Sequence, residues 1–429
     1  MERNLMQHLL EWKKDSNRKP LILKGCRQSG KTWLMKEFGR LYFNNVAYIN
    51  FDHNERMQKV FRKDFDIQRI MLAINAETNV AIVPDETLII LDEIQEAPEA
   101  LTALKYFCEN AREYHVIAAG SLLGVAIHNK VSFPVGKVNT MNLYPLSFRE
   151  FLSALGENGL REMIDASDYE GLSSFDSKLN ELLKNYYYVG GMPEAVQRFI
   201  DTKDYMQVRK VHEEIIELYE NDFGKHIDAK ELPRVRLVWN SIPMQLAKDN
   251  KKFFFGHMKK GARAKEFEIA VEWLIDCGLI HKVYRVTKAG IPLKAYTDFS
   301  AYKLFLSDVG LLGAMAELDT RTLLEGNNLF VEFKGALTEQ YVLQQLVSDT
   351  DYTPYYYTSE SGKYEIDFMI QKKGHIVPIE VKAEENLKSK SLKAFCEKNK
   401  PEEALRLSMK GYRKQEWLTN MPLYSAGKI

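Results

Sequence analysis

The stretch Gly25-Cys26-Arg27-Gln28-Ser29-Gly30-Lys31-Thr32 decides the fold of this chain. It matches the pattern G-x-x-x-x-G-K-[ST], in which glycines let backbone N–H groups close around phosphate oxygens. The apolar run Pro20–Leu23 before it predicts a buried strand, and Trp33–Phe38 after it predicts a helix whose N-terminus adds partial positive charge. Strand, glycine loop and helix in this order predict a phosphate-binding loop in an α/β sheet.

Two side chains of this loop have expected chemical roles. Lys31 is expected to reach the β- and γ-phosphates of ATP, and the Thr32 hydroxyl to bind Mg²⁺. The alternative is a glycine-containing loop with a chance lysine, which the flanking strand and helix disfavour. The other expected cofactor-binding residues are Gly25, Cys26 (as a passive filler), Arg27, Gln28, Ser29, Gly30 and Trp33.

A second apolar run, Thr87–Leu91, ends in the acidic pair Asp92-Glu93. It predicts a buried parallel strand that delivers carboxylates at its C-terminal end, where ligands bind in open α/β sheets. We expect Asp92 to hold Mg²⁺ through water and Glu93 to act as general base on the attacking water. The alternative is a strand followed by an acidic helix cap.

A third run, His115–Ala119, predicts another buried strand. Ser121 follows it and is our candidate for sensing the γ-phosphate; alternatively, it caps the next helix. Strands that alternate with helices predict a parallel sheet covered on both faces.

Length and composition limit the class of protein. With 429 residues, 45% of them hydrophobic, we expect two to four packed domains. The formal net charge is zero, so the whole-chain charge indicates no partner. The four cysteines lie far apart, which disfavours a zinc site or disulfides. Because no run approaches the ~20 apolar residues of a membrane span and no secretory signal is present, we expect a cytoplasmic protein without membrane contact.

Several motifs in order carry a family resemblance. The phosphate loop, Leu91–Gln95, Ala119–Ser121 and Leu143–Phe151 together resemble a family of prokaryotic AAA+-related P-loop ATPases, close to the signalling ATPases with numerous domains. The resemblance covers nearly the whole chain and implies ATP binding, a helical lid, a winged helix and an uncharacterised C-terminal domain.

Two further segments resemble signatures of the same family. Tyr188–Glu194 is similar to its Gly-Gly-x-Pro module, and Phe305–Leu311 is similar to another of its motifs. The resemblance implies that Pro193 lies beside the nucleotide base. As an alternative, the two glycines end a helix. Lys137 and Arg149 are further candidates for contacting the nucleotide.

The segment Lys230–Asp298 is basic, with fourteen Lys/Arg against seven Asp/Glu. Two predicted helices followed by a hairpin indicate a winged helix, a module that the family carries. Its cations suit phosphate contacts to double-stranded DNA; the alternatives are a solvated basic face or a protein-docking module. The cations cluster before the second helix: Lys251, Lys252, Lys259, Lys260, Arg263 and Lys265.

Near the C-terminus, Tyr364–Ile370 and Ile376–Lys382 alternate as two strands around a turn. If the turn is centred between residues 373 and 374, Asp367 faces Glu380 and Glu365 faces Lys382 on one side of the sheet.

This hairpin resembles the metal site of the PD-(D/E)xK nucleases. The resemblance implies that Asp367 and Glu380 hold Mg²⁺ or Mn²⁺, that Lys382 orients or activates water, and that Glu339 completes the ligand shell. The alternative is a charged hairpin with a Glu365–Lys382 salt bridge, or a related fold that only binds.

We therefore expect an α/β protein: a P-loop NTPase parallel sheet (1–160), a helical lid (161–228), a winged helix (229–312) and an α/β PD-(D/E)xK-like domain (313–429). The expected function is an ATP-hydrolysing switch that couples its nucleotide state to a DNA-associated, nuclease-like domain. The rival is a signalling or scaffold ATPase without nuclease activity, whose C-terminal modules bind proteins or a second copy of the chain.

Overall fold

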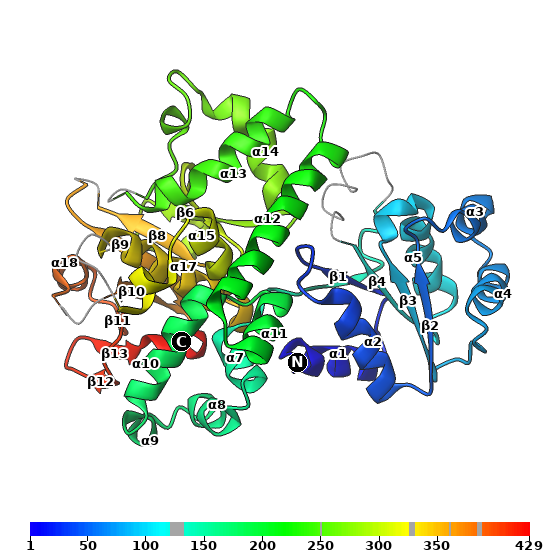
Figure 1. Cartoon of the computed structure of the whole chain (residues 1–429), viewed down its shortest axis with the longest axis horizontal. Helices are drawn as coiled ribbons and strands as arrows, with labels where there is room; N and C mark the ends of the chain where they lie inside the picture. The colour runs from blue at the N-terminus through cyan, green and yellow to red at the C-terminus, as the bar shows by residue number, and fades with distance from the viewer. Residues whose placement is uncertain (121–132, 249–250, 326–330, 360–361, 384–387) are drawn as a thin grey trace. The chain divides into compact units, whose positions relative to one another are not determined.

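The computed structural model describes residues 1–120, 133–248, 251–325, 331–359, 362–383 and 388–429 (Figure 1). The chain forms two compact units. The amino-terminal unit contains Glu2–Tyr144 and the short stretch Glu272–Leu279. The carboxy-terminal unit contains Met1, Pro145–Val271 and Ile280–Ile429. The predicted lid, winged helix and C-terminal domain thus lie mostly within one unit, and the boundaries proposed between them stay predictions.

The amino-terminal unit is built on a five-stranded sheet in the order β2-β3-β4-β1-β5, with every neighbouring pair parallel. This confirms the predicted parallel α/β sheet. The phosphate loop lies between β1 and α2, and the acidic pair lies at the end of β3. The elements are α1 (Leu5–Lys14), β1 (Leu21–Lys24), α2 (Lys31–Tyr42), β2 (Asn45–Asn50), α3 (Glu55–Lys63), α4 (Ile67–Thr78), β3 (Thr87–Asp92), η1 (Ile94–Glu96), α5 (Pro98–Asn110), β4 (His115–Ala119) and β5 (Asn139–Asn142).

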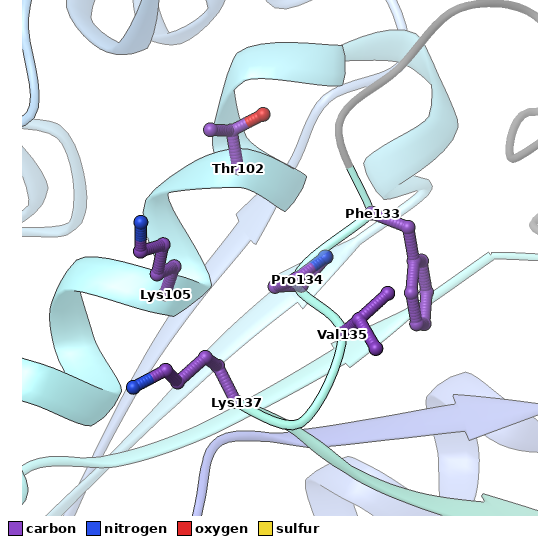
Figure 2. A pocket seen from close by; sticks show the side chains of 6 residues that line it. All are labelled: Thr102, Lys105, Phe133, Pro134, Val135 and Lys137. Atoms are coloured by element: carbon purple, nitrogen blue, oxygen red, sulfur yellow. The ribbon is translucent and has the colours of Figure 1, made fainter.

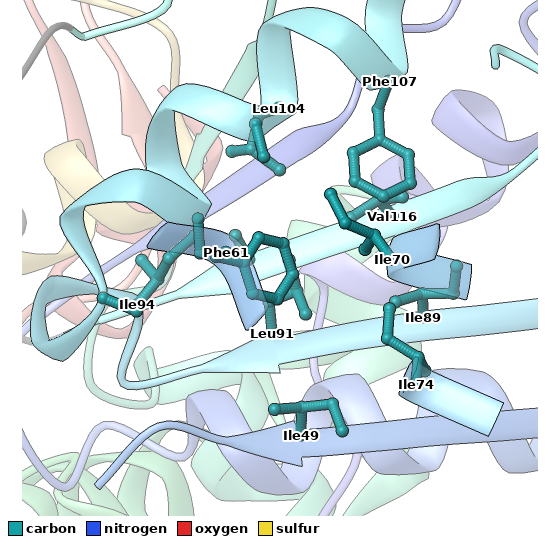
Figure 3. Packing of buried hydrophobic residues seen from close by; sticks show 14 of the residues in the cluster. Ile49, Phe61, Ile70, Ile74, Ile89, Leu91, Ile94, Leu104, Phe107 and Val116 are labelled. Carbon is teal, nitrogen blue, oxygen red and sulfur yellow. The ribbon is translucent and has the colours of Figure 1, made fainter. Parts of the chain in front are cut away.

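Helices cover both faces of this sheet. Successive side chains of a strand point to opposite faces, so each strand packs against helices on both sides. In β3, Leu88 and Ile90 pack with the apolar residues of α1 and α2. Ile89 and Leu91 pack instead with residues of α3, α4 and α5, as Figure 3 shows. A strand buried on both faces must be apolar throughout, which is why β3 could be read from the sequence.

The carboxy-terminal unit contains most of the helices. The segment 161–228, predicted as a helical lid, is helical from the second half of α8 to α12, and α17 is a long helix rich in buried polar side chains. The helices are α7 (Phe148–Ala154), α8 (Asn158–Asp165), α9 (Tyr169–Ser173), α10 (Asp176–Val189), α11 (Pro193–Thr202), α12 (Tyr205–His226), α13 (Leu232–Leu246), η2 (Phe255–His257), α14 (Ala264–Asp276, whose last residues belong to the other unit), η3 (Leu293–Tyr296), α15 (Val309–Met315), α16 (Thr320–Glu325), α17 (Val331–Asp349), α18 (Lys390–Asn399) and η5 (Leu423–Lys428).

An eight-stranded sheet joins the predicted wing to the predicted C-terminal domain. Its order is β12-β13-β11-β10-β9-β8-β6-β7. The helices α13 and α14 and the antiparallel pair β6–β7 follow the order expected of a winged helix, but β6 also pairs in parallel with β8. The hairpin is therefore one edge of a larger sheet and not a free wing. The strands are β6 (Ile280–Val286), β7 (Thr297–Leu306), β8 (Tyr355–Thr358), β9 (Glu365–Lys372), β10 (His375–Lys382), β11 (Leu405–Ser408), β12 (Arg413–Lys414) and β13 (Thr419–Pro422).

The predicted register of the C-terminal hairpin is confirmed along most of its length. The pairs run from His375 opposite Lys372 to Ile379 opposite Phe368, each summing to 747 as expected. On its other side, however, β9 carries one residue more than β8 between two successive pairs. In this bulge Asp367 and Phe368 together lie opposite the single residue Tyr356 of β8.

Among the described residues, no helix is both long and apolar enough to cross a membrane.

Candidate functional site

The phosphate loop has the backbone shape that its glycines permit. Gly30 caps α2 in a left-handed conformation (φ 93°), and Gly25 has φ 153°. A Cβ atom at Gly25 would lie 2.3 Å from the Leu143 carbonyl oxygen, so a larger residue does not fit. Ser29 is buried and its hydroxyl donates to the Cys26 carbonyl at 2.8 Å. The loop is therefore pre-shaped, with the N-terminus of α2 directed at the ligand position.

Lys31, the lysine predicted to reach the phosphates, is buried in this loop. Only 6% of its surface is exposed, and its Nζ donates to the carbonyl oxygens of Gly25 and Cys26 at 2.8 Å each. Burial lowers the pKa of Lys31, while the nearby carboxylates of Glu93 and Asp92 act in the opposite direction. A phosphate oxygen is a better acceptor for an ammonium group than a neutral carbonyl, so Lys31 is placed to exchange these partners for a nucleotide.

Asp92 joins the end of β3 to the phosphate loop. Its Oδ2 accepts hydrogen bonds from the Thr32 hydroxyl at 2.7 Å and from the Tyr48 hydroxyl at 3.0 Å. Its Oδ1 accepts from the Glu93 N–H at 3.1 Å. Burial, followed by the charge of Asp92, raises the pKa of Tyr48, which therefore remains a donor.

The chemistry of this cluster suits Mg²⁺. A hydroxyl and a carboxylate oxygen lie within 2.7 Å of each other beside the loop, and hard oxygen ligands of this kind are what Mg²⁺ takes together with phosphate oxygens and water. Thr32 and Asp92 would hold the ion, directly or through water. Sequence reasoning missed Tyr48, whose only signal is its place near the end of the strand beside β3.

Glu93 lies in a left-handed turn (φ 51°) directly after β3. Its Oε2 accepts from the Gln95 side-chain amide at 2.5 Å. Glu93 is half-buried, and its carboxylate is therefore oriented but still reachable by a water molecule. This is the arrangement that a general base requires.

Arg3 is a second residue that sequence reasoning missed. It is buried, and its guanidinium donates to the carbonyl oxygens of Ser29 at 3.0 Å and Tyr144 at 2.5 Å. It thus supports the phosphate loop from a position 26 residues away in the sequence.

The remaining predicted nucleotide contacts are placed differently. Ser121 lies outside the described residues. Trp33 is 44% exposed on α2, and Pro193 is the first residue of α11 in the carboxy-terminal unit; their contacts with a nucleotide stay predictions. Lys137 forms an ion pair with Glu109 at 2.8 Å.

Arg149 has a structural role. It lies between two carboxylates, Asp165 and Asp349, and its bond to Asp349 is 3.0 Å. Burial opposes its charge, but Asp349 and Asp165 outweigh this and raise the pKa of Arg149. A guanidinium engaged in this way is not available to a nucleotide without breaking a buried ion pair.

The Gly-Gly and Ser-Asp-Val-Gly motifs meet at a buried aspartate. Asp308 accepts from the Gly191 N–H at 2.6 Å and caps α15 by accepting from the Leu311 N–H at 3.0 Å. A Cβ atom at Gly190 would lie 2.2 Å from the Asp308 carboxylate, and one at Gly191 would lie 2.1 Å from the Leu146 carbonyl oxygen. Close packing thus explains both glycines.

A pocket of about 280 Å³ lies between α5 and the segment before β5 (Figure 2). Figure 2 shows Lys105 and Lys137 on one side and Phe133 and Val135 on the other. None of its lining residues belongs to the phosphate loop or to the acidic pair, so it is separate from the nucleotide site. Its lining residues are Thr102, Lys105, Phe133, Pro134, Val135 and Lys137.

The carboxylates predicted to form a second metal site have separate partners. Asp367 Oδ2 accepts from the Val381 N–H at 2.7 Å, whereas Glu380 pairs with Lys382 at 2.6 Å. The register shift lies between β9 and β8, whereas the β9–β10 pairing that relates the two carboxylates is regular up to Phe368 opposite Ile379. These separate contacts do not test the shared metal site predicted for Asp367 and Glu380, which stays a prediction.

Two lysines neutralise the other acids of this region. Lys303 is fully buried and pairs with Glu365 at 2.5 Å and with Glu339 at 3.7 Å, and Lys251 also pairs with Glu339. The Glu365–Lys382 salt bridge expected as the alternative is thus replaced by Glu365–Lys303. Within the described ranges, no three His, Cys, Asp or Glu side chains come close enough to hold a metal ion. The metal-binding roles of Glu339, Asp367 and Glu380 stay predictions.

Comparison with known proteins agrees with the amino-terminal site. Residues 17–152 match a family model described as an AAA domain. Residues 180–322 and 334–425 match two models described as domains of unknown function, DUF8612 and DUF4143. None of the curated proteins matches the chain.

The chain is also similar to solved structures at low identity. A Walker-type ATPase of Pyrococcus abyssi is 14% identical over 73% of this chain and 95% of that chain, with a TM-score of 0.46. Orc1 of Aeropyrum pernix, solved in complex with DNA, is 12% identical over 74% of this chain and 93% of its own, with a TM-score of 0.28. Orc2 of Aeropyrum pernix, in its ADP form, is 13% identical over 79% and 93%, with a TM-score of 0.33. These structures carry no argument here. Residues 17–152 are similar to an AAA domain, and their phosphate loop and parallel sheet are those of a P-loop fold.

Proposed function

We propose that the chain is an ATP-hydrolysing switch that acts on DNA through its carboxy-terminal unit. One observation carries the ATPase half: the hydrogen bond of 2.7 Å from Thr32 to Asp92, which brings the end of β3 to the phosphate loop. Each remaining part of an ATPase site lies on the same two segments. Lys31 follows Gly30, and Glu93 follows Asp92.

The residues divide the work as follows. The loop amides and the N-terminus of α2 bind the phosphates, and Lys31 turns from two carbonyl oxygens to the β- and γ-phosphates. Thr32 and Asp92 would hold Mg²⁺, and the bound ion would supply positive charge beside the phosphates. Glu93 accepts a proton from the attacking water, and Gln95 keeps its carboxylate oriented.

Nucleotide binding tests this proposal. Lys31→Ala should abolish Mg²⁺-dependent ATP binding measured by calorimetry, because the loop loses its only lysine. Lys59→Ala is the matched control, since Lys59 is an exposed lysine of the same unit that pairs with Glu55 on its own helix. Unchanged ATP affinity in Lys31→Ala would contradict the site.

The DNA half of the proposal rests on a basic surface before α14. Lys259, Lys260, Arg263 and Lys265 are all exposed and can meet a phosphate backbone. Lys251 is excluded from this surface because it pairs with Glu339. Neutralising the four exposed cations should weaken binding to duplex DNA and reduce its salt slope by about 1 for each lost contact. Equal binding across salt concentrations would favour the rival, a scaffold ATPase that binds proteins.

Cleavage of DNA is the part of the proposal that needs the largest rearrangement. In the structure, lysines neutralise Glu339 and Glu380, so these side chains do not form a ready divalent site, and we derive no cleavage step from them. One observation still favours the hypothesis: Glu380 Oε2 is buried and accepts no hydrogen bond from the described residues. Stabilisation of the protein by Mn²⁺ that disappears in Glu380→Gln would support a metal site there. If Mn²⁺ stabilises neither protein, the cleavage hypothesis is wrong and the C-terminal domain is a module that only binds.

A further inference from the structure

The hairpin β6–β7 alternates aromatic and basic side chains. Between Ile280 and Tyr302 it carries three tyrosines and one phenylalanine, together with three lysines and one arginine. The only acid in this segment, Asp298, is held by Arg285 at 2.5 Å and by the Ser300 hydroxyl at 2.6 Å. The hairpin therefore keeps a net positive charge, to which the exposed Lys288 and Lys294 contribute.

Three of the rings form one cluster. Tyr284 lies opposite Tyr302 across the two strands, with ring centroids 6.0 Å apart. Phe299 meets the Tyr284 ring edge to face, with centroids 5.4 Å apart and an interplanar angle of 72°. Lys282 lies over both tyrosine rings, 5.3 Å from the centroid of Tyr284 and 4.8 Å from that of Tyr302.

Phe299 is the exposed member of this cluster, with 75% of its surface accessible. A single exposed apolar side chain needs no explanation. Here, however, the ring is fixed by an aromatic neighbour that is itself only half-exposed, and Ile291 on the connecting loop is 49% exposed as well. Lys288 and Lys294 on the same loop are both exposed.

We propose that this hairpin is a binding platform for single-stranded DNA, in which a base stacks on Phe299 while Lys288 and Lys294 contact the phosphates. Rings that offer a π-face beside lysines that follow a backbone are what proteins use to bind single strands without sequence preference. A duplex keeps its bases stacked on one another and cannot use the ring. The choice of DNA over RNA rests on the proposed DNA association, whereas the platform itself is separate from the basic surface before α14.

Binding of the full-length protein to a fluorescent oligo(dT) tests the platform. Phe299→Leu should weaken binding about 5-fold or more, because it keeps the apolar contact but removes the ring on which a base stacks. Phe299→Trp should bind at least as tightly as the wild type. Phe175→Leu is the matched control, since Phe175 is an exposed phenylalanine of the same unit and should change nothing.

Salt dependence supplies a second readout. Replacing Lys288 and Lys294 with alanine should reduce the salt slope for oligo(dT) by about 1.4, the value for two phosphate contacts on a single strand. ATP hydrolysis and binding to duplex DNA by the surface before α14 should stay at wild-type level in Phe299→Leu, so failure of the proposed duplex binding and failure of the platform are distinguishable.

Three results would overturn the proposal. If the wild type does not bind oligo(dT), the platform has no such ligand. If Phe299→Leu binds as tightly as the wild type, the ring does not stack on a base. If oligo(U) binds more tightly than oligo(dT), the assignment to DNA is wrong.

Discussion

The buried lysine of the carboxy-terminal unit gives the sharpest test of how the charges there are balanced. In Lys303→Met, a chain of similar length replaces an ammonium group that is fully buried between Glu365 and Glu339, 2.5 and 3.7 Å away. Removing one partner of a buried ion pair costs about 3–5 kcal/mol, because the remaining charge stays buried without compensation. We expect a loss of this size at pH 8. Lys372→Met is the control: its pair with Glu403 is 3.3 Å long and partly exposed, so about 1 kcal/mol or less should be lost.

The pH dependence of this loss follows from the pKa values. Burial opposes the charge of Lys303, but Glu365 and Glu339 outweigh it and raise its pKa, so its stabilising effect is fully present below the pKa of an unfolded lysine. In the variant the carboxylates left behind can take up protons, so the loss should shrink towards pH 4. Urea unfolding of the full chain, monitored by hydrogen exchange in peptides from α17 and β9, measures this loss of stability. A loss below 1 kcal/mol at pH 8, or one independent of pH, would refute the reasoning.

Three further predictions concern other described contacts. Tyr48→Phe removes a hydrogen-bond donor to Asp92 and should raise the Mg²⁺ concentration needed for half-maximal ATP hydrolysis about 10-fold, which is the effect of losing a residue that orients a metal ligand. An unchanged Mg²⁺ titration would show that Tyr48 does not position the carboxylate. Gly191→Ala places a methyl group 2.1 Å from a backbone carbonyl oxygen and should destabilise the carboxy-terminal unit by about 1–3 kcal/mol. The control Gly224→Ala adds its methyl group in open space on a helix and should stabilise the unit by about 0.5–1 kcal/mol. Equal melting temperatures of the two variants would contradict the packing argument. Burial, with the charge of the neighbouring Glu339, raises the pKa of Asp367 to about 7, so the free energy of unfolding should fall as the pH rises from about 4 to about 7. Asp367→Asn should flatten this fall. Parallel pH profiles of the variant and the wild type would contradict this prediction.

Local chemistry explains which parts of the site were predictable. The phosphate loop and the pair Asp92-Glu93 were predictable because each is a short continuous segment. The glycines and lysine of the first and the acids of the second serve the same ligand. The five-stranded sheet was predictable because strands buried on both faces have an uninterrupted apolar run, as Leu88–Leu91 in β3. The C-terminal hairpin register was predictable because a tight turn at Lys373-Gly374 determines which residues face each other.

What escaped prediction depends on residues far apart in the sequence. Tyr48 lies 44 residues from Asp92 in the sequence, and Arg3 lies 26 residues from Ser29; only the fold brings each pair together. The parallel pairing of β6 with β8, which turns the expected wing into a sheet edge, has no local signal. The extra residue of β9 opposite β8 likewise depends on pairing between distant strands and has no local signal.

The central claim is that Glu93 activates water at a site that Lys31, Thr32 and Asp92 assemble around Mg²⁺ and ATP. Single-turnover hydrolysis of ATP by Glu93→Gln, with ATP affinity measured on the same sample, tests it most directly. The account predicts unchanged affinity and hydrolysis slower by about 100-fold or more, since a general base contributes at least that factor. Hydrolysis at the wild-type rate in a variant that still binds ATP would contradict it.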